Sequence, residues 1–328
     1  MLDTFRPLQT IAQKDMEDSL RDRFILIVTL FLATATLTSL VTGAVALNTD
    51  VALFEKAKAT LLALGKSPAD IVSPDFYPLR LLRGAIEQIE IIGAILGILI
   101  GHRAAAGERG RQTFALIMTR PLNAWQFLAG KVLGGGILIS GGLAVVFGLG
   151  AILLQLVSGV SLTATDLLRI GLVWILASAY TTVFFLLAFL AALRMKRPLN
   201  ALLLSFTIWL LLVLVAPQIG DTLDPDNQVA GGVFRQLHIP KAEEERIKGN
   251  YAVFEQIRGG IESASVTKHF ERFSFAVLGI KESYAGKPLA PILVEKSGDV
   301  LWILCFTFGL GGLVFSRRLS IDKITKEN

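Results

Sequence analysis

Six long apolar stretches, separated by polar segments, run along this chain of 328 residues. A helix needs about 20 predominantly apolar residues to cross a bilayer, and each stretch approaches or exceeds that length. The pattern therefore predicts an all-α integral membrane protein with six transmembrane helices. They are expected over residues 24–47, 84–101, 132–157, 170–193, 199–216 and 299–315.

The polar segments divide the chain into regions. Residues 1–23 precede the first span, and residues 24–216 hold spans 1 to 5, including a long polar loop at 102–131. A large polar segment follows at 217–298. Residues 299–328 hold span 6 and a short polar tail.

The distribution of positive charge predicts the orientation in the membrane. Short cytosolic loops are enriched in Lys and Arg. The tight turn between spans 4 and 5 contains Arg194, Lys196 and Arg197, whereas the short loop between spans 3 and 4 contains Arg169 as its one basic residue. Both termini and the loop at 102–131 are therefore expected to be cytosolic.

The amino-terminal segment is polar but patterned. Phe5, Leu8, Met16 and Leu20 recur at near-helical spacing, with charged residues between them. This pattern predicts an amphipathic helix that lies in the plane of the membrane interface and leads into span 1. The alternative is a solvated amphipathic helix without a membrane role.

Segments 48–83 and 217–298 are expected outside the membrane, the first as a loop and the second as a cap of helices. Two sets of apolar residues follow helical spacing in the cap, and Gly259 and Gly260 are expected to separate them. The first set is Ile247, Tyr251, Phe254 and Ile257, and the second is Val266, Phe270, Phe273 and Val277. The acidic and basic residues of the cap are nearly balanced in number, so the cap shows no preference for a charged ligand.

Composition agrees with a membrane protein. Hydrophobic residues make up 53% of the chain and charged residues 18%, compared with roughly 25% charged residues in soluble domains. The net charge of +5 reflects Lys and Arg at the cytosolic face rather than nucleic-acid binding, because no basic stripe is interleaved with aromatic residues. The single cysteine, Cys305, excludes an intrachain disulfide.

Span 1 carries three threonines at intervals of four, which places them on one face of the helix. They are Thr34, Thr38 and Thr42. Small polar residues in this arrangement are typical of helix–helix packing in membranes. A polar strip along a substrate path is the alternative interpretation.

Span 2 carries Gly93, Gly97 and Gly101 at the same interval. Such a ridge lets a neighbouring helix approach closely. Glu87 and Glu90 lie in the outer third of this span, where buried carboxylates are often functional. A structural role is favoured, because an arginine precedes Glu87 by four residues and could pair with it along the helix.

Several kinds of chemistry are not supported by the sequence. The centres of the spans carry no charged residues, which argues against the hypothesis of an ion-coupled carrier, because such carriers need ionisable groups to bind the coupling ion. His102, His238 and His269 all lie in predicted loops, which argues against an intramembrane protease and against a metal site. No complete phosphate-binding loop occurs. The chain is therefore not expected to be an enzyme, and active transport would need energy from another subunit.

The loop at 102–131 is expected to contain a short amphipathic helix. Phe114, Ile117 and Met118 fall at positions i, i+3 and i+4, which gives the helix one apolar stripe. Pro121 is expected to end it, since a proline pushes the preceding residue out of the α region. This short helix needs a membrane surface or a partner protein to cover its apolar face.

Four runs of residues in this loop stand in a characteristic order: Glu108-Arg109, Phe114-Ala115-Leu116-Ile117, Arg120-Pro121-Leu122 and Phe127-Leu128-Ala129-Gly130-Lys131. Their order and spacing resemble the signature of ABC-2 type permeases. Lys14-Asp15 and Arg21-Asp22-Arg23, before span 1, are similar to the interfacial elbow helix of the same family. With its large outer segment at 217–298, the chain most resembles the nitrous-oxide-reductase maturation type of these permeases.

The resemblance implies a permease dimer, homo- or heteromeric, with two separate ATPase subunits that bind ATP and Mg. The loop helix would then be a coupling helix on which those subunits act. Glu108, Arg109 and Arg111 would contact the ATPase, Phe114, Ile117 and Met118 would seat the helix, and Arg120 and Pro121 would complete the interface.

The family resemblance also implies an exporter in the cytoplasmic membrane of a prokaryote, surrounded by lipid. A further protein could bind the cap at 217–298, and no nucleic acid is expected as a partner. Two alternatives from other classes stay open: a membrane scaffold or assembly factor that binds an extracytoplasmic partner, and an ion-coupled secondary carrier.

Overall fold

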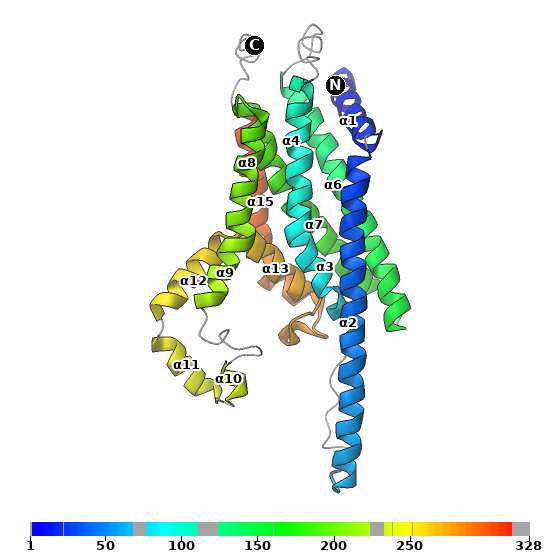
Figure 1. Ribbon diagram of the computed structural model, residues 1–328, viewed down its shortest axis with the longest axis vertical. Helices are drawn as coiled ribbons and strands as arrows, with labels where there is room; N and C mark the ends of the chain where they lie inside the picture. Colours follow the sequence, from blue (N-terminus) through cyan, green and yellow to red (C-terminus); the bar gives the residue numbers. More distant parts are fainter. Residues whose placement is uncertain are drawn as a thin grey trace.

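The structure is a computed structural model that describes residues 2–21, 23–67, 77–110, 124–159, 161–223, 233–237, 239–250 and 252–316. Every regular element in these ranges is helical, and no strand occurs among them. Figure 1 shows a bundle of long helices with shorter helices near one end. The prediction of an all-α protein is confirmed for these residues.

Among the described residues, six segments are long and apolar enough to cross a membrane, which is the number of spans that the sequence predicted. A separate helix, α1 (Leu2–Arg21), precedes them. In chain order the spans are built from α2 (Phe24–Ala63); η2 (Pro78–Leu82), α3 (Arg83–Gln88), η3 (Ile89–Gly93) and α4 (Ala94–Gly110); α6 (Ala124–Ser158); α7 (Ala164–Arg194); α8 (Pro198–Trp209), η4 (Leu210–Val215) and α9 (Ala216–Leu223); and α15 (Ser297–Phe315).

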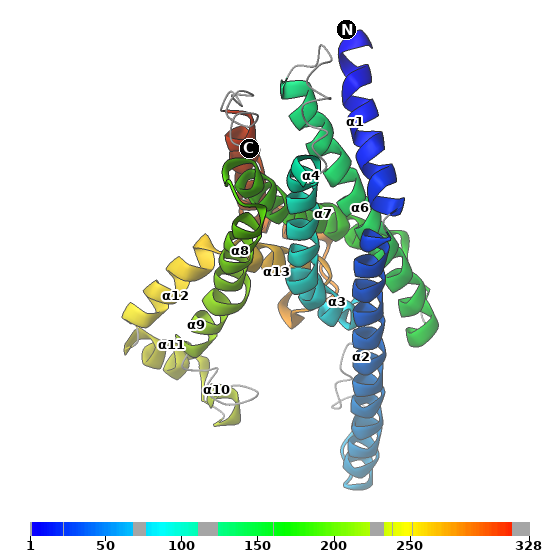
Figure 2. The ribbon, with the colours of Figure 1, turned by 45° about the horizontal axis from the view of Figure 1, so that its top comes forward.

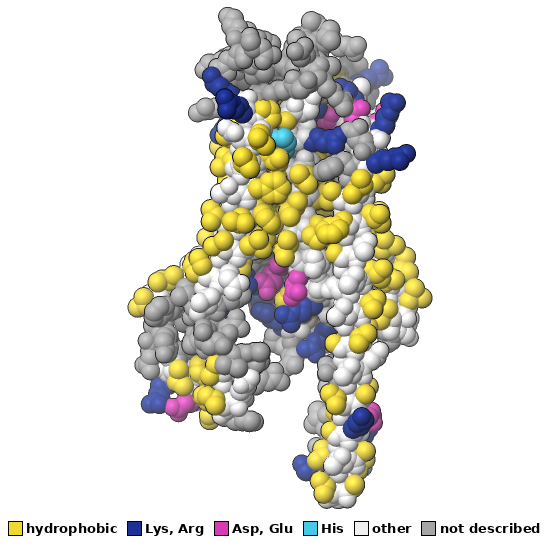
Figure 3. All heavy atoms as spheres, viewed as in Figure 1, with side chains coloured by type: hydrophobic (Ala, Val, Ile, Leu, Met, Phe, Trp, Pro, Cys, Tyr) yellow, Lys and Arg dark blue, Asp and Glu magenta, His cyan; other side chains and the backbone are white. Residues whose placement is uncertain are grey.

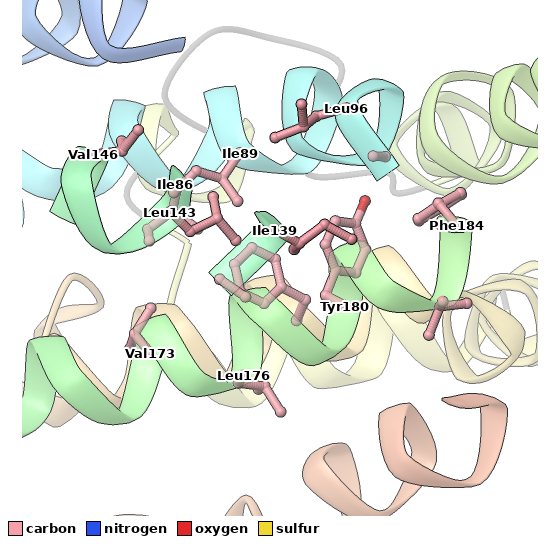
Figure 4. Packing of buried hydrophobic residues seen from close by; sticks show 14 of the residues in the cluster. Ile86, Ile89, Leu96, Ile139, Leu143, Val146, Val173, Leu176, Tyr180 and Phe184 are labelled. Carbon is pink, nitrogen blue, oxygen red and sulfur yellow. The ribbon is translucent and has the colours of Figure 1, made fainter. Parts of the chain in front are cut away.

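The central helix of the bundle is α7, which packs against α4, α6 and α15. Its aromatic side chains Tyr180, Phe184, Phe185 and Phe189 are almost completely buried. Figure 4 shows Tyr180 beside Ile139 of α6. Lipid tails are as apolar as these side chains, so the association of the helices depends on close packing rather than on the exclusion of water.

The glycines of span 2 lie against α7. A Cβ atom at Gly97 would be 2.4 Å from the Thr181 carbonyl oxygen, and one at Gly101 would be 2.1 Å from the Phe185 carbonyl oxygen. At Gly93 it would be 3.4 Å from the Thr181 hydroxyl oxygen. The absence of side chains at these positions therefore lets α4 touch the backbone of α7.

The helix that contains the first span is longer than the sequence predicted. α2 continues as a helix through residues 48–63, which were expected to form a loop. This stretch is rich in Ala, Leu and Lys, which favour helix, and it contains no glycine or proline. The helix ends before Gly65, whose φ of 84° is easily adopted only by glycine.

Span 3 begins earlier than predicted, at Ala124 rather than near residue 132. Lys131 therefore lies inside a helix and not in a loop. It is only 3% exposed, and its charge is compensated by Asp15 of α1. Because its charge is paired, Lys131 can lie inside the buried helix, and its position did not mark the start of span 3.

Two expected helix breaks do not occur. Pro217 lies inside a helical run that passes from α8 through the π-helical segment η4 into α9, and the helix continues to Leu223. Local π-helical adjustments of this kind let membrane helices accommodate a proline. Gly259 and Gly260 lie within α12 (Ala252–Ala264). The break comes at Ser265, whose side chain accepts a hydrogen bond from the backbone N–H of Lys268 and so caps the next helix.

That next helix, α13 (Val266–Val277), belongs to the bundle core although it lies between spans 5 and 6. It packs against α7 and α15, and the Phe270 ring stacks on Tyr180 with 4.8 Å between centroids. In the same region α10 (Val233–Gln236), α11 (Lys241–Asn250) and α12 lie further out in Figure 1. After α13 come η6 (Glu282–Tyr284) and α14 (Leu289–Glu295), and α14 packs against α13 and α15.

The bundle has two distinct ends. α1, the ends of α4 and α6 that flank residues 111–123, and the turn between α7 and α8 lie at one end in Figure 1. α10, α11 and the far part of α2 lie at the other. The described ends of the loop singled out in the sequence therefore lie at the same end of the bundle as the amino-terminal helix and the basic turn.

Candidate coupling site

The residues of the proposed coupling helix fall largely outside the described part of the chain. Glu108 and Arg109 lie on the last turn of α4, but the positions of their side chains are not among those the structure describes. The other members lie outside the described residues altogether; they are Arg111, Phe114, Ile117, Met118, Arg120 and Pro121. The described part of the site consists of the helices that flank them.

One flank is the contact between α6 and α1. The Lys131 Nζ atom donates a hydrogen bond of 2.7 Å to Asp15 Oδ1, and both side chains are largely buried. The same nitrogen lies 5.5 Å from the centre of the Phe127 ring. Removing one partner of a buried ion pair leaves an uncompensated charge, which typically costs about 3–5 kcal/mol. The pair therefore holds α1 in a defined place.

Glycines bring the two helices together. A Cβ atom at Gly130 would lie 2.8 Å from Ile11 Cβ, and one at Gly134 would lie 3.1 Å from the Ala12 carbonyl oxygen. Ala12 is 3% exposed. The apolar face of α1, for which the sequence predicted contact with the membrane interface, is thus covered at these positions by α6.

The other flank is the contact between α4 and α8. His102 Nε2 lies 2.9 Å from the Pro198 carbonyl oxygen, at hydrogen-bond distance. Arg194, at the end of α7, donates a bond of 3.3 Å to the Leu313 carbonyl oxygen of α15. These bonds link the ends of spans 2, 4, 5 and 6 near the candidate site.

The threonines of span 1 satisfy their hydroxyl groups within their own helix. Thr34, Thr38 and Thr42 each donate to the carbonyl oxygen four residues earlier, at distances of 2.8, 3.0 and 2.9 Å. All three residues are exposed in this chain. Their face of α2 is therefore open to lipid, to a substrate or to a second protein.

A second group of charged residues lies at the opposite end of the bundle, over α3 and α13, where Figure 3 shows acidic and basic side chains in a hollow below the apolar band. Arg83 pairs with Glu87 at 2.9 Å, as the four-residue spacing indicated. Lys268 pairs with Glu271 at 2.8 Å. The buried Glu90 Oε1 atom makes no hydrogen bond to any described residue. No local pattern in the chain indicated that α13 contributes to this group, because more than 150 positions separate it from span 2.

The junction of α12 and α13 contains a shared carboxylate. Glu262 accepts a hydrogen bond of 2.9 Å from Arg258 and another from Arg272. Burial acts to raise the pKa of Glu262, but the two arginines together hold that pKa below its ordinary value. The contribution to stability is therefore present above the unfolded pKa, about 4.3, and is lost as the pH falls through the folded pKa.

We accordingly expect the junction to loosen in acid. A spin label at Ala264→Cys, with Cys305→Ser, should become more mobile as the pH is lowered from 7 to 3. In the Glu262→Gln variant the same spin label should be mobile at every pH in this range. Glu243→Gln, which removes an exposed pair with Arg246, should behave like the parent. A label whose mobility does not change with pH would contradict the expectation.

Comparison with known proteins agrees with the resemblance of the loop. The ABC-2 family of transporter proteins matches residues 9–273, from α1 to α13. A relative from Pseudomonas aeruginosa, described as a probable ABC transporter permease protein NosY, is 27% identical over 149 residues, which is 45% of this chain and 45% of the relative. One of the same description from Stutzerimonas stutzeri is 27% identical over 206 residues, 62% of this chain and 66% of the relative. The matches thus span less than half of the first relative and about two thirds of the second.

Proposed function

Because the chain belongs to the ABC-2 family of transporter proteins, we propose that it is the permease of an ATP-driven exporter powered by separate ATPase subunits. The observation that carries the proposal is the extent of the family match, which includes the whole loop at 102–131 and both helices that flank it. The similar proteins described as permeases support the same assignment.

The flanking helices suit a coupling role for this loop. α6 runs without interruption from Ala124 to Ser158, and α4 lies directly on the backbone of α7. A push on residues 111–123 would therefore enter two stiff helices that reach deep into the bundle. Closely packed helices respond to such a push by shifting or rotating as units.

The proposal specifies the partners. Two ATPase subunits, which would hold ATP and Mg, would contact Glu108, Arg109 and Arg111 from the cytosol. A second permease would cover the exposed face of α2 with its threonines, and lipid would surround the remaining apolar surface. An extracytoplasmic protein could contact α10 to α12. The complex would lie in the cytoplasmic membrane of a prokaryote.

Co-purification with the ATPase tests the proposal. The chain should co-purify with a soluble ATPase encoded beside it. Exchanging the charges in Glu108→Arg with Arg109→Glu should abolish that association, because both charges at the contact are reversed. The matched control exchanges Glu55→Lys with Lys58→Glu, a pair on the far part of α2, and should leave the association intact.

Membrane insertion of both double variants is checked by extraction of the membrane fraction. If the variant with exchanged Glu108 and Arg109 inserts normally and still binds the ATPase, these residues do not have the proposed coupling role. Failure of the parent chain to bind any ATPase would reject the proposed function itself.

The scaffold alternative rests on α10 to α12, which project from the side of the bundle in Figure 1, with α12 packed against α9 and α13. A scaffold would bind an extracytoplasmic partner without stimulating nucleotide hydrolysis. Reconstitution of the chain with its ATPase in vesicles separates the two candidates, since only a permease should change the hydrolysis rate of that ATPase.

A further inference from the structure

The amino-terminal helix α1 is joined more extensively to α6 than to α2, which follows it in the chain. Figures 1 and 2 both show α1 and α6 side by side. Between α1 and α2, Arg23 has a φ of 57°, in the left-handed region that residues other than glycine rarely adopt. The covalent connection from α1 to α2 thus contains a break in the helix at Arg23, while the larger packing contact of α1 is with α6.

The contact between α1 and α6 combines two features of the sequence that lie more than a hundred residues apart. Gly130 and Gly134 allow the backbone of α1 to come close, and Lys131, between them, reaches Asp15 at 2.7 Å. Lys131 and Asp15 are each largely buried, so neither charge is well solvated by water. The ion pair therefore helps to stabilise both buried charges, and it links the register and the rotation of the two helices.

We propose that Asp15 and Lys131 are positioning residues that lock α1 to α6, so that the two helices move as one lever about the turn at Arg23. α6 begins directly after residues 111–123, and Lys131 lies within its first two turns. A push on that loop would therefore move the start of α6 and carry α1 with it. The driving force rests on the proposed function, whereas the lock is a property of the permease alone.

The lock is tested on the purified full-length permease in lipid nanodiscs, in a Cys305→Ser background. Spin labels at Gln9→Cys and Leu133→Cys report the distance from α1 to α6, and labels at Gln9→Cys and Leu30→Cys report the distance from α1 to α2. The first distance should have one narrow distribution and the second a broader one.

The variants then identify what holds the helices. Asp15→Asn and Lys131→Met should each broaden the distribution between α1 and α6, and the exchange of Asp15→Lys with Lys131→Asp should narrow it again. Glu17→Gln, which removes an exposed carboxylate from the same helix, is the control and should leave it narrow. An unchanged distribution in Asp15→Asn, or equal broadening in Glu17→Gln, overturns the lock.

A steric variant keeps the test decisive if the charge variants do not insert. Gly130→Ala places a Cβ atom 2.8 Å from Ile11 Cβ and leaves both charges in place. It should also broaden the distribution between α1 and α6. A narrow distribution in this variant overturns the close contact on which the lock depends.

The lever is tested in the complex with the ATPase, with and without a non-hydrolysable ATP analogue. The distance from α1 to α2 should shift on nucleotide binding, while the distance from α1 to α6 should stay constant. A shift between α1 and α6, or no shift in either distance, overturns the lever. Absence of any bound ATPase would reject the proposed function and leave the nanodisc test of the lock standing.

Discussion

Arg169→Met is expected to detach the segment after α13 from the bundle. Arg169 is 3% exposed and donates bonds of 2.6 Å to the Val277 carbonyl oxygen and 2.5 Å to the Lys287 carbonyl oxygen. Methionine fills similar space but donates no hydrogen bond. The bond to Val277 is buried, and a buried carbonyl left without a partner costs about 1–3 kcal/mol. Its loss, together with the partly buried bond to Lys287, should therefore lower the thermal stability of the purified protein.

The matched control for this change is Arg194→Met at the other end of α7. Arg194 is exposed and makes a longer bond, of 3.3 Å, to Leu313, so its replacement should alter the unfolding temperature far less. Limited proteolysis should show faster cleavage within residues 278–288 in Arg169→Met alone. Equal unfolding temperatures for the two variants would show that Arg169 does not fasten this segment.

Gly101→Ala and Gly136→Ala are expected to change stability in opposite directions. At Gly101 the added Cβ would lie 2.1 Å from the Phe185 carbonyl oxygen, whereas at Gly136 nothing lies within 4 Å. Alanine in a helix is favoured over glycine by about 1 kcal/mol, so Gly136→Ala should stabilise. Gly101→Ala should destabilise, because overpacking of this kind costs about 1–3 kcal/mol.

Thermal unfolding in detergent measures both glycine variants. Gly97→Ala, with a Cβ 2.4 Å from the Thr181 carbonyl oxygen, should follow Gly101→Ala. If all three variants were equally stable, the contact between α4 and α7 would not depend on the missing side chains. The glycine ridge of span 2 would then have to be explained differently.

The sequence predicted the spans well because membrane helices are specified by a local property. A continuous apolar run of sufficient length has to be helical in lipid, where every backbone polar group needs a partner within its own segment. Helix ends outside the membrane follow weaker signals. Residues 48–63, Pro217 and the pair Gly259-Gly260 were misjudged for this reason.

The candidate site was only partly accessible to sequence reasoning. Gly130-Lys131 and Lys14-Asp15 were recognised as motifs, but nothing in either indicated that one would pair with the other. The carboxylate of Asp15 and the ammonium group of Lys131 are joined across 116 positions of the chain. Such a pair follows from how the helices pack and not from any local pattern.

The amino-acid order by itself determined that this protein has six apolar helices, where polar segments interrupt them, and which family its loop resembles. Those features depend on the hydrophobicity and spacing of neighbouring residues, and they do not require the helices to meet. The tertiary structure decided that α13 is part of the core, that α1 lies on α6, and that Arg169 fastens the segment after α13. Those contacts join residues far apart in the chain, and they arise only when side-chain shape and charge are matched in three dimensions.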